Sequence, residues 1–199
     1  MANISAQMVK DLRQETGAGV LDCKQALELH NGDFEKAAAW LREKGMAAAA
    51  KRSEREAREG IIGSYIHAGS RVAALVELNC ETDFVARTPE FQELAHDLAM
   101  QVVAARPPYL SPETVPAEVV QELKSLYQAE IDQAGKTGQV AERIMEGKLN
   151  KWYEENCLLL QPFIKDPDVT VGELVKQKSS TFGENVVVRR FARLEVGES

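Results

Sequence analysis

The residues of this chain that could carry out chemistry gather around one cysteine. Cys80 is followed at once by Glu81, and Asp83 stands three positions after it. His67 could face the thiol across a hairpin if the strand register were favourable. A nucleophilic cysteine needs a stabilised thiolate, whereas neighbouring carboxylates raise the pKa of a thiol by like-charge repulsion. The surroundings of Cys80 therefore disfavour a thiol enzyme, which we keep only as an alternative.

No other set of residues has the spacing of an active site or a metal site. The chain has three histidines and three cysteines: His30, His67, His96, Cys23, Cys80 and Cys157. None of the histidines is spaced with a second His or Cys as zinc ligands are, and an odd number of scattered cysteines indicates a reducing compartment. The phosphate-binding patterns G-x-x-x-x-G-K-S/T and G-x-G-x-x-G are also absent from the sequence. We therefore expect no enzyme activity, no cofactor and no metal.

Phe84 is the other unusual residue of this segment, because it stands beside Asp83 on a short connection after an apolar strand. Such a ring either folds back over its own core or is free to enter another protein. Composition and spacing alone favour the first interpretation, in which Phe84 covers the end of its own sheet and Asp83 caps the turn. Val20 and Leu21, at a helix start, allow the same two interpretations: a hydrophobic staple or an exposed contact patch.

The overall composition points to a folded protein that does not bind polyanions. Apolar residues make up 44% of the 199 positions, which is enough for a sizeable core. The formal net charge of -7 argues against direct binding to nucleic acid or to an anionic membrane. Residues 1–5 begin a polar helix instead of a leader, and no apolar run approaches the roughly 18 residues of a membrane span. We therefore expect a cytoplasmic protein.

Helical spacing dominates the first 59 residues. Ser5 and Asp33 are good N-caps, and glycines interrupt the pattern at Gly17 and Gly32, so three short helices are predicted. They should form a compact bundle over residues 1–45. Residues 46–59 contain alanines with interleaved acidic and basic residues and few large apolar groups. We interpret 46–59 as an exposed helical linker.

From residue 60 the pattern changes to alternation. Residues 62–66 and 72–78 alternate on either side of a glycine-containing turn, which predicts a β-hairpin, and residues 185–196 alternate again. Between them, Thr88 followed by Pro89 begins a helix with one apolar stripe. The predicted fold class is α+β, with a core over 60–199 of about three antiparallel strands and packed helices.

The rest of this core is predicted from turn and capping signals. Two helical segments within about 116–155 meet at a glycine-containing turn, which predicts an antiparallel helical hairpin. The Asp-Pro step at 166–167 predicts a turn. Thr170, with Glu173 three positions later, forms a capping box that begins another short helix.

Two long motifs resemble one known family. Residues 12–27, LRQETGAGVLDCKQAL, closely resemble the amino-terminal signature of translation elongation factor Ts. Residues 77–87, ELNCETDFVAR, resemble the second signature of the same family. Gly60-Ile61-Ile62, Gln161-Pro162-Phe163 and Gly183-Glu184-Asn185 also stand where the family has them, so the resemblance covers essentially the whole chain.

The resemblance implies a guanine-nucleotide exchange factor of translation elongation that acts on elongation factor Tu. Thr82, Asp83, Phe84 and Val85 match the family segment that dislodges magnesium from the GTPase, with Phe84 as the wedge. The first 45 residues resemble the family's ubiquitin-associated-type bundle, which docks on the partner. Three residues there match its docking contacts: Leu12, Val20 and Leu21. A generic protein-interaction module that uses this bundle alone is the alternative.

The resemblance also implies an oligomeric state. Short family members correspond to one half of a longer type that carries a duplicated core. A half core would leave an incomplete sheet surface and an open edge. The resemblance therefore implies a homodimer.

Overall fold

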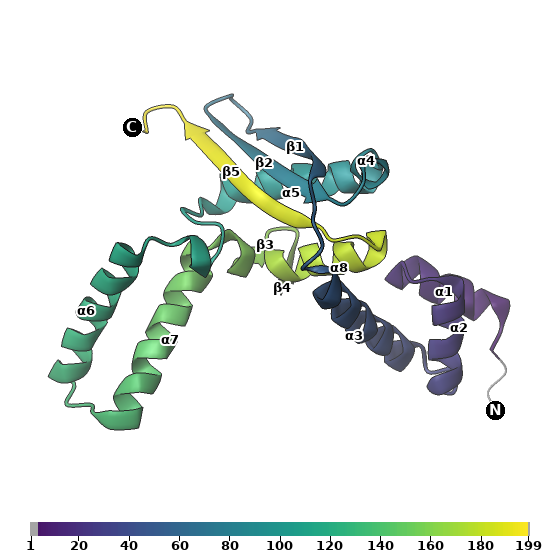
Figure 1. The fold of residues 1–199 in the computed structure, drawn as a ribbon, viewed down its shortest axis with the longest axis horizontal. Helices are drawn as coiled ribbons and strands as arrows, with labels where there is room; N and C mark the ends of the chain where they lie inside the picture. The colour runs from purple at the N-terminus through teal and green to yellow at the C-terminus, as the bar shows by residue number, and fades with distance from the viewer. Residues whose placement is uncertain (1–3, 199) are drawn as a thin grey trace. The chain divides into compact units, whose positions relative to one another are not determined.

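The computed structural model describes residues 4–198 of the chain (Figure 1), which divide into two compact units. The first unit takes in the described chain up to Ile61 together with Leu78–Gln92 and Leu174–Val188. The second takes in Ile62–Glu77, Glu93–Glu173 and the described chain from Arg189. The predicted polar start at residues 1–3 and the last position of the predicted 60–199 range lie outside the described residues.

Helices and strands follow one another in a mixed order, which confirms the predicted α+β class. The helices are α1 (Ala6–Thr16), α2 (Val20–Leu29), α3 (Phe34–Arg52), α4 (Asp83–Ala86), α5 (Pro89–Ala105), α6 (Ala117–Gln133), α7 (Gly138–Asn156) and α8 (Val171–Phe182), with 3-10 turns at Pro112–Thr114 and Leu158–Leu160. The strands are β1 (Glu59–Ile66), β2 (Val72–Cys80), β3 (Pro162–Phe163), β4 (Asp166–Thr170) and β5 (Val187–Glu195). Over residues 4–198, no helix has both the length and the apolar character that a membrane crossing requires.

The first three helices form the predicted bundle, and local hydrogen bonds fix their ends. The Ser5 hydroxyl accepts from the backbone N–H of Met8 (3.2 Å), and the Asp33 carboxylate accepts from that of Lys36 (3.1 Å). Gly17 ends α1 in the left-handed conformation (φ 68°), where a larger residue would be strained. The three helices enclose one buried cluster: Leu12, Cys23, Ala26, Leu27, Ala37, Ala38 and Leu41.

Helix α3 is longer than the sequence pattern predicts. It continues to Arg52 without a break, so the boundary predicted between residues 45 and 46 lies inside a helix. Ala49 is buried, and Arg52 Nη2 donates to the carbonyl oxygen of Ser179 in α8 (3.3 Å). Residues 46–52 are helical and mostly exposed, as the linker prediction expects, although Ala49 is buried. Because the helix ends at Arg52, the prediction of a helix is wrong for residues 53–58.

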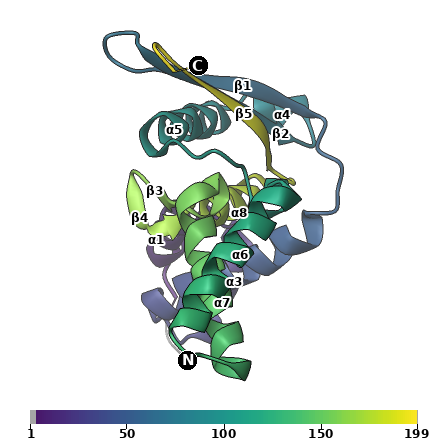
Figure 2. The same cartoon turned by 90° about the vertical axis from the view of Figure 1, so that its left-hand side faces the viewer.

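The three longest strands form one antiparallel sheet in the order β1-β2-β5. On β2 the side chains of Ala74, Val76 and Leu78 are buried, as the alternation predicts. Helix α5 lies along one face of this sheet (Figure 2). The predicted apolar stripe of α5 belongs to the core, and all of its members are buried: Phe91, Leu94, Ala95, Leu98, Ala99, Val102 and Val103.

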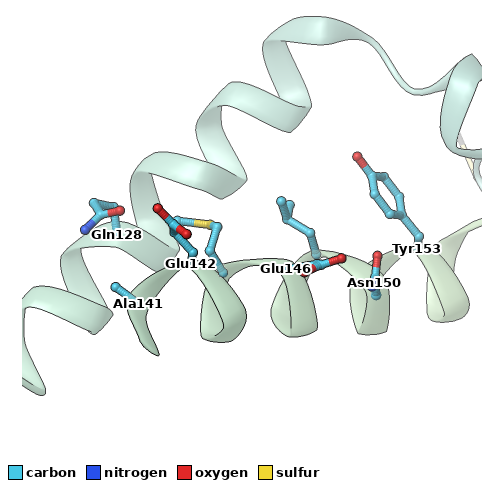
Figure 3. Close-up of a pocket in the computed structure, with 8 residues that line it drawn as sticks. Gln128, Ala141, Glu142, Glu146, Asn150 and Tyr153 are labelled. Atoms are coloured by element: carbon cyan, nitrogen blue, oxygen red, sulfur yellow. The ribbon is translucent and has the colours of Figure 1, made fainter. Parts of the chain in front are cut away.

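Helices α6 and α7 form the predicted helical hairpin, in which they run side by side (Figure 1). An ion pair joins them, with Lys148 Nζ 2.6 Å from Glu130 Oε2. A groove along the hairpin mixes two carboxylates with amide, aromatic and apolar groups (Figure 3). Its lining residues are Gln128, Ala141, Glu142, Met145, Glu146, Leu149, Asn150 and Tyr153.

A second, smaller sheet was not predicted. Strand β3 pairs with β4 in an antiparallel arrangement, so the Asp-Pro step at 166–167 opens a strand instead of forming only a turn. This strand could not be recognised from the sequence, because proline normally disfavours sheet structure away from edges. The predicted capping box beyond it is confirmed, since the backbone N–H and the hydroxyl of Thr170 donate to Glu173 Oε2 at 2.8 and 3.0 Å.

Gly63 is required where β1 passes α5. A Cβ atom at this position would collide with the backbone carbonyl of Ala95. Backbone atoms cannot move aside as the end of a flexible side chain can, so we expect Gly63→Ala to lower the free energy of unfolding by about 1–3 kcal/mol. Denaturant unfolding followed by circular dichroism measures the change.

Gly147, inside α7, is the matched control. Nothing lies within 4 Å of a Cβ atom added there, and alanine has the higher helix propensity. Gly147→Ala should therefore raise the free energy of unfolding by about 0.5–1 kcal/mol. Equal stability of the two variants would contradict the close approach of β1 to α5.

Candidate functional site

Phe84 projects into water from a well-defined helical turn. Its side chain is 80% exposed, whereas Ala86, two positions later in α4, is buried. The interpretation that Phe84 covers the end of its own sheet is therefore wrong. Helix α4 turns the small residue toward the core and leaves the ring outside.

Thr82, not Asp83, caps this turn. The Thr82 hydroxyl oxygen accepts from the backbone N–H of Val85 at 3.5 Å, and Val85 itself is half-buried. Asp83 instead forms an ion pair with Arg87, with 2.7 Å between Oδ2 and Nη2. Such an exposed pair contributes only about 0–1 kcal/mol, so a partner could engage the Asp83 carboxylate at little energetic cost.

Two residues from the far end of the sequence hold the turn in place. Glu184 accepts three hydrogen bonds from Glu81 and Thr82, and the backbone N–H of Asn185 donates to Glu81 Oε1 at 2.6 Å. The sequence pattern assigned no role to Glu184 or Asn185 beyond their place in the resemblance. The signal that could have found them is a polar Glu-Asn pair immediately before an apolar strand.

Cys80 has the environment of a structural thiol. It is fully buried, and its Sγ donates to the carbonyl oxygen of Thr82 at 3.1 Å. Burial raises the pKa of Cys80 to about 11, and the nearby charge of Glu184 acts in the same direction. His67 does not serve as its base: the backbone N–H of His67 bonds to Val72, at the opposite end of β2, and its ring contacts Tyr65.

The predicted docking residues of the bundle divide into two kinds. Val20 and Leu21, in the first turn of α2, are 51% and 82% exposed, so they form an exposed apolar patch and not a buried staple. Leu12 is fully buried among the three helices. The prediction that Leu12 contacts a partner is corrected accordingly, because its side chain has no free surface and serves the core of the bundle.

The comparisons with known proteins agree over almost the whole chain. A family profile described as "Elongation factor TS" matches residues 5–198. A protein of Moorella thermoacetica named Elongation factor Ts is 54% identical over 195 residues, which cover 98% of this chain and 96% of that protein. The chain belongs to the elongation factor Ts family. The predicted resemblance is thereby confirmed.

Two further relatives extend the comparison. The proteins named Elongation factor Ts from Thermodesulfovibrio yellowstonii and Carboxydothermus hydrogenoformans are each 53% identical to this chain. The matched segments cover 98% of this chain and 98% and 90% of those proteins, respectively. Membership of the elongation factor Ts family supports a role as an elongation factor of protein biosynthesis.

The described residues around Phe84 do not form a metal site. Within residues 4–198, no group of three or more His, Cys, Asp and Glu side chains is placed to hold a metal ion. The groups nearest Phe84 act within the fold: the Cys80 thiol donates to the turn, the Thr82 hydroxyl caps α4, and Glu184 accepts from backbone N–H groups. The Phe84 ring, by contrast, is 80% exposed.

The raised pKa of Cys80 predicts slow thiol chemistry. With a pKa of about 11, roughly one Cys80 in a thousand is ionised at pH 8. We expect Cys80 of the folded protein to react with a thiol reagent at least about a hundredfold more slowly than after unfolding in guanidinium chloride. Mass spectrometry of timed labelling reactions measures both rates, and rapid labelling in the folded state would contradict the structural role.

The same shift predicts a pH dependence of stability. The folded-state pKa of Cys80 lies above the ordinary value of 9.0, so the neutral thiol's contribution is fully present below pH 9 and is lost as the pH rises toward 11. Cys80→Ala removes this titration. The difference in unfolding free energy between the original chain and the Cys80→Ala variant should therefore shrink between pH 9 and 11.

Proposed function

We propose that this protein is the guanine-nucleotide exchange factor of elongation factor Tu, and that Phe84 is the wedge that promotes GDP release. The observation that carries the proposal is the 80% exposure of this ring on a capped helical turn, within a chain of the elongation factor Ts family. Burying a phenylalanine side chain in a partner gains about 2 kcal/mol. A rigid, exposed aromatic residue is the usual kind of residue at the centre of a protein interface.

Exchange by this route requires no reaction chemistry in the factor. If the factor binds the nucleotide-free GTPase more tightly than the GDP-bound form, GDP must bind the complex more weakly by the same ratio. In the proposed mechanism Phe84 enters between two helices of the partner, and Asp83 contacts polar groups at the same cleft. The resulting shift displaces magnesium, which leaves the diphosphate charge poorly compensated. GDP then dissociates, and GTP refills the site.

The bundle supplies affinity in this proposal. Val20 and Leu21 form an exposed apolar patch at the start of α2, and we assign to this patch the binding of elongation factor Tu. The exposed carboxylates of a chain with a net charge of -7 do not favour direct contact with nucleic acid. We place the activity in the cytoplasm, where translation elongation takes place. Residues 1–45 are thus the proposed docking domain, and residues 60–199 the proposed core and dimerisation domain.

The open face of the three-stranded sheet supports the homodimer. Helix α5 lies along one face (Figure 2). Large apolar side chains on the strands remain exposed. Glu77 and Arg190 form an ion pair there, with 2.6 Å between Oε2 and Nε. A second copy with the same surface could bury this apolar set in a two-fold arrangement. The exposed members are Ile62, Ile66, Leu75 and Leu194.

The exchange proposal predicts separate effects on rate and affinity. Phe84→Ala should lower the maximal rate of GDP release from elongation factor Tu about 30-fold, which corresponds to a hot-spot loss of about 2 kcal/mol. Asp83→Ala should lower it less, in the same direction. Val20→Ser or Leu21→Ser should raise KM about tenfold with little change in the maximal rate. Release of a fluorescent GDP analogue measures both parameters in stopped flow.

Leu29→Ser is the matched control for the bundle, because Leu29 lies in the last turn of α2 and is 57% exposed but belongs to no proposed contact. It should leave both parameters unchanged.

Full stimulation by both Phe84→Ala and Asp83→Ala would rule out the wedge. Loss of activity on Cys80→Ser alone would favour a thiol enzyme. Full activity of a fragment without residues 60–199 would favour a generic interaction module.

The dimer proposal predicts that a charge on the open sheet face separates the copies. Leu75→Glu would bury a carboxylate at the interface, so the dimer dissociation constant should rise by at least about 100-fold. Light scattering after size-exclusion chromatography measures the mass. Val140→Glu, at a 54% exposed position of α7, is the control and should remain dimeric. A monomeric original chain, or a dimeric Leu75→Glu variant, would contradict the proposal.

A further inference from the structure

We infer that Glu184 is a positioning residue for Phe84: its carboxylate, together with Asn185, fixes the turn that carries the ring and ties that turn to the end of α3. This inference rests on the proposed function of Phe84 and adds to it a residue that does not contact the partner in the proposed mechanism. Glu184 and the turn both lie in the first unit.

The Glu184 carboxylate accepts three hydrogen bonds from two consecutive residues. Oε2 accepts from the backbone N–H groups of Glu81 and Thr82, each at 3.0 Å. Oε1 accepts from the Thr82 hydroxyl at 2.6 Å. A carboxylate can accept all three bonds, whereas an amide in its place would turn an NH2 group toward one of the donors. The turn is therefore held by charge-assisted hydrogen bonds.

The same contacts orient the Thr82 hydroxyl, which caps α4. Since the Thr82 hydroxyl donates its single proton to Glu184, its lone pairs remain available to the backbone N–H of Val85. A helix of one turn has little stability of its own, so a fixed cap decides whether it forms. Glu184 thus acts on Phe84 through Thr82, which directly precedes α4.

Asn185 adds a hydrogen bond in the opposite direction, from its own backbone to the Glu81 side chain. Glu81 donates its backbone N–H to Glu184, and its own carboxylate accepts the backbone N–H of Asn185 at 2.6 Å. The Asn185 amide Nδ2 donates to the carbonyl oxygens of Ser53 (3.3 Å) and Arg55 (2.7 Å), just beyond α3. Asn185 is 5% exposed, so these bonds are protected from competing water.

The pair itself is attached to helices. The Ser179 hydroxyl of α8 donates to the Glu184 carbonyl oxygen at 2.5 Å. Phe182 packs edge to face against Phe91 of α5, with 5.7 Å between ring centroids. Glu184 and Asn185 therefore join the ring-bearing turn to α3, which is also a helix of the docking bundle. Their contribution is orientation, which matters for a ring that must enter a cleft in one pose.

The test separates rate from affinity. We expect Glu184→Gln to lower the maximal rate of GDP release from elongation factor Tu about tenfold, with KM changed less than about twofold, because Val20 and Leu21 remain intact. Glu122→Gln removes the same charge from an exposed position of α6, outside the proposed docking domain, and should change neither parameter. Release of a fluorescent GDP analogue is measured over a range of Tu–GDP concentrations.

A second pair of variants keeps the test valid if Glu184→Gln folds poorly by circular dichroism. Thr82→Val removes the hydroxyl that links Glu184 to the cap and should lower the maximal rate by a similar factor. Thr82→Ser retains the hydroxyl and should restore most of it. Equal rates for Thr82→Val and Thr82→Ser would overturn the inference.

The double variant distinguishes the inference from the proposed function. If Glu184 acts through Phe84, Glu184→Gln should have little further effect in a Phe84→Ala background. A full tenfold loss in that background, or an unchanged rate for Glu184→Gln alone, overturns the positioning role. An unchanged rate for both Phe84→Ala and Asp83→Ala overturns the proposed function instead.

Discussion

An aromatic ring that stays in water cannot fix its own position, and this constraint explains the structure around Phe84. The ring forgoes about 2 kcal/mol of burial in the free protein. Its orientation must therefore come from the backbone and from polar groups on either side: the Thr82 cap, the Glu184 carboxylate and the buried Ala86. A flexible turn would lose conformational entropy on binding, and the fixed turn has already lost it during folding.

Polar groups that suggest chemistry in the sequence are used here for structure. Cys80 donates to the turn, and Glu81 and Glu184 accept backbone N–H groups that would otherwise need water. Apolar groups remain exposed instead, at Val20 and Leu21 and on the open face of the sheet. This distribution suits a family whose members work by contact with other proteins.

Local rules predicted the parts of the fold that depend on neighbours in sequence. The caps at Ser5 and Asp33, the stripe of α5 and the helical hairpin needed only spacing and turn residues. The exposure of Phe84 could not be predicted this way, because it depends on which side of α4 meets the core. The cap was assigned to Asp83 for the same reason: Thr82 is favoured by Glu184, a hundred positions away. The end of α3 at Arg52 could not be predicted in this way either, because Arg52 bonds to Ser179 in α8, a distant segment.

The contact between the turn and Glu184 also orders events during synthesis. Glu81 and Glu184 are 103 positions apart, so closing this loop has an entropic cost that the hydrogen bonds repay only once both segments exist. While the ribosome is still adding the residues between them, the bundle can already fold, because its contacts are local. Under the proposed function, a nascent chain of this kind docks on elongation factor Tu before its ring is aligned. Under that proposal, nucleotide release begins only once Glu184 and Asn185 are free to fold, at the end of synthesis.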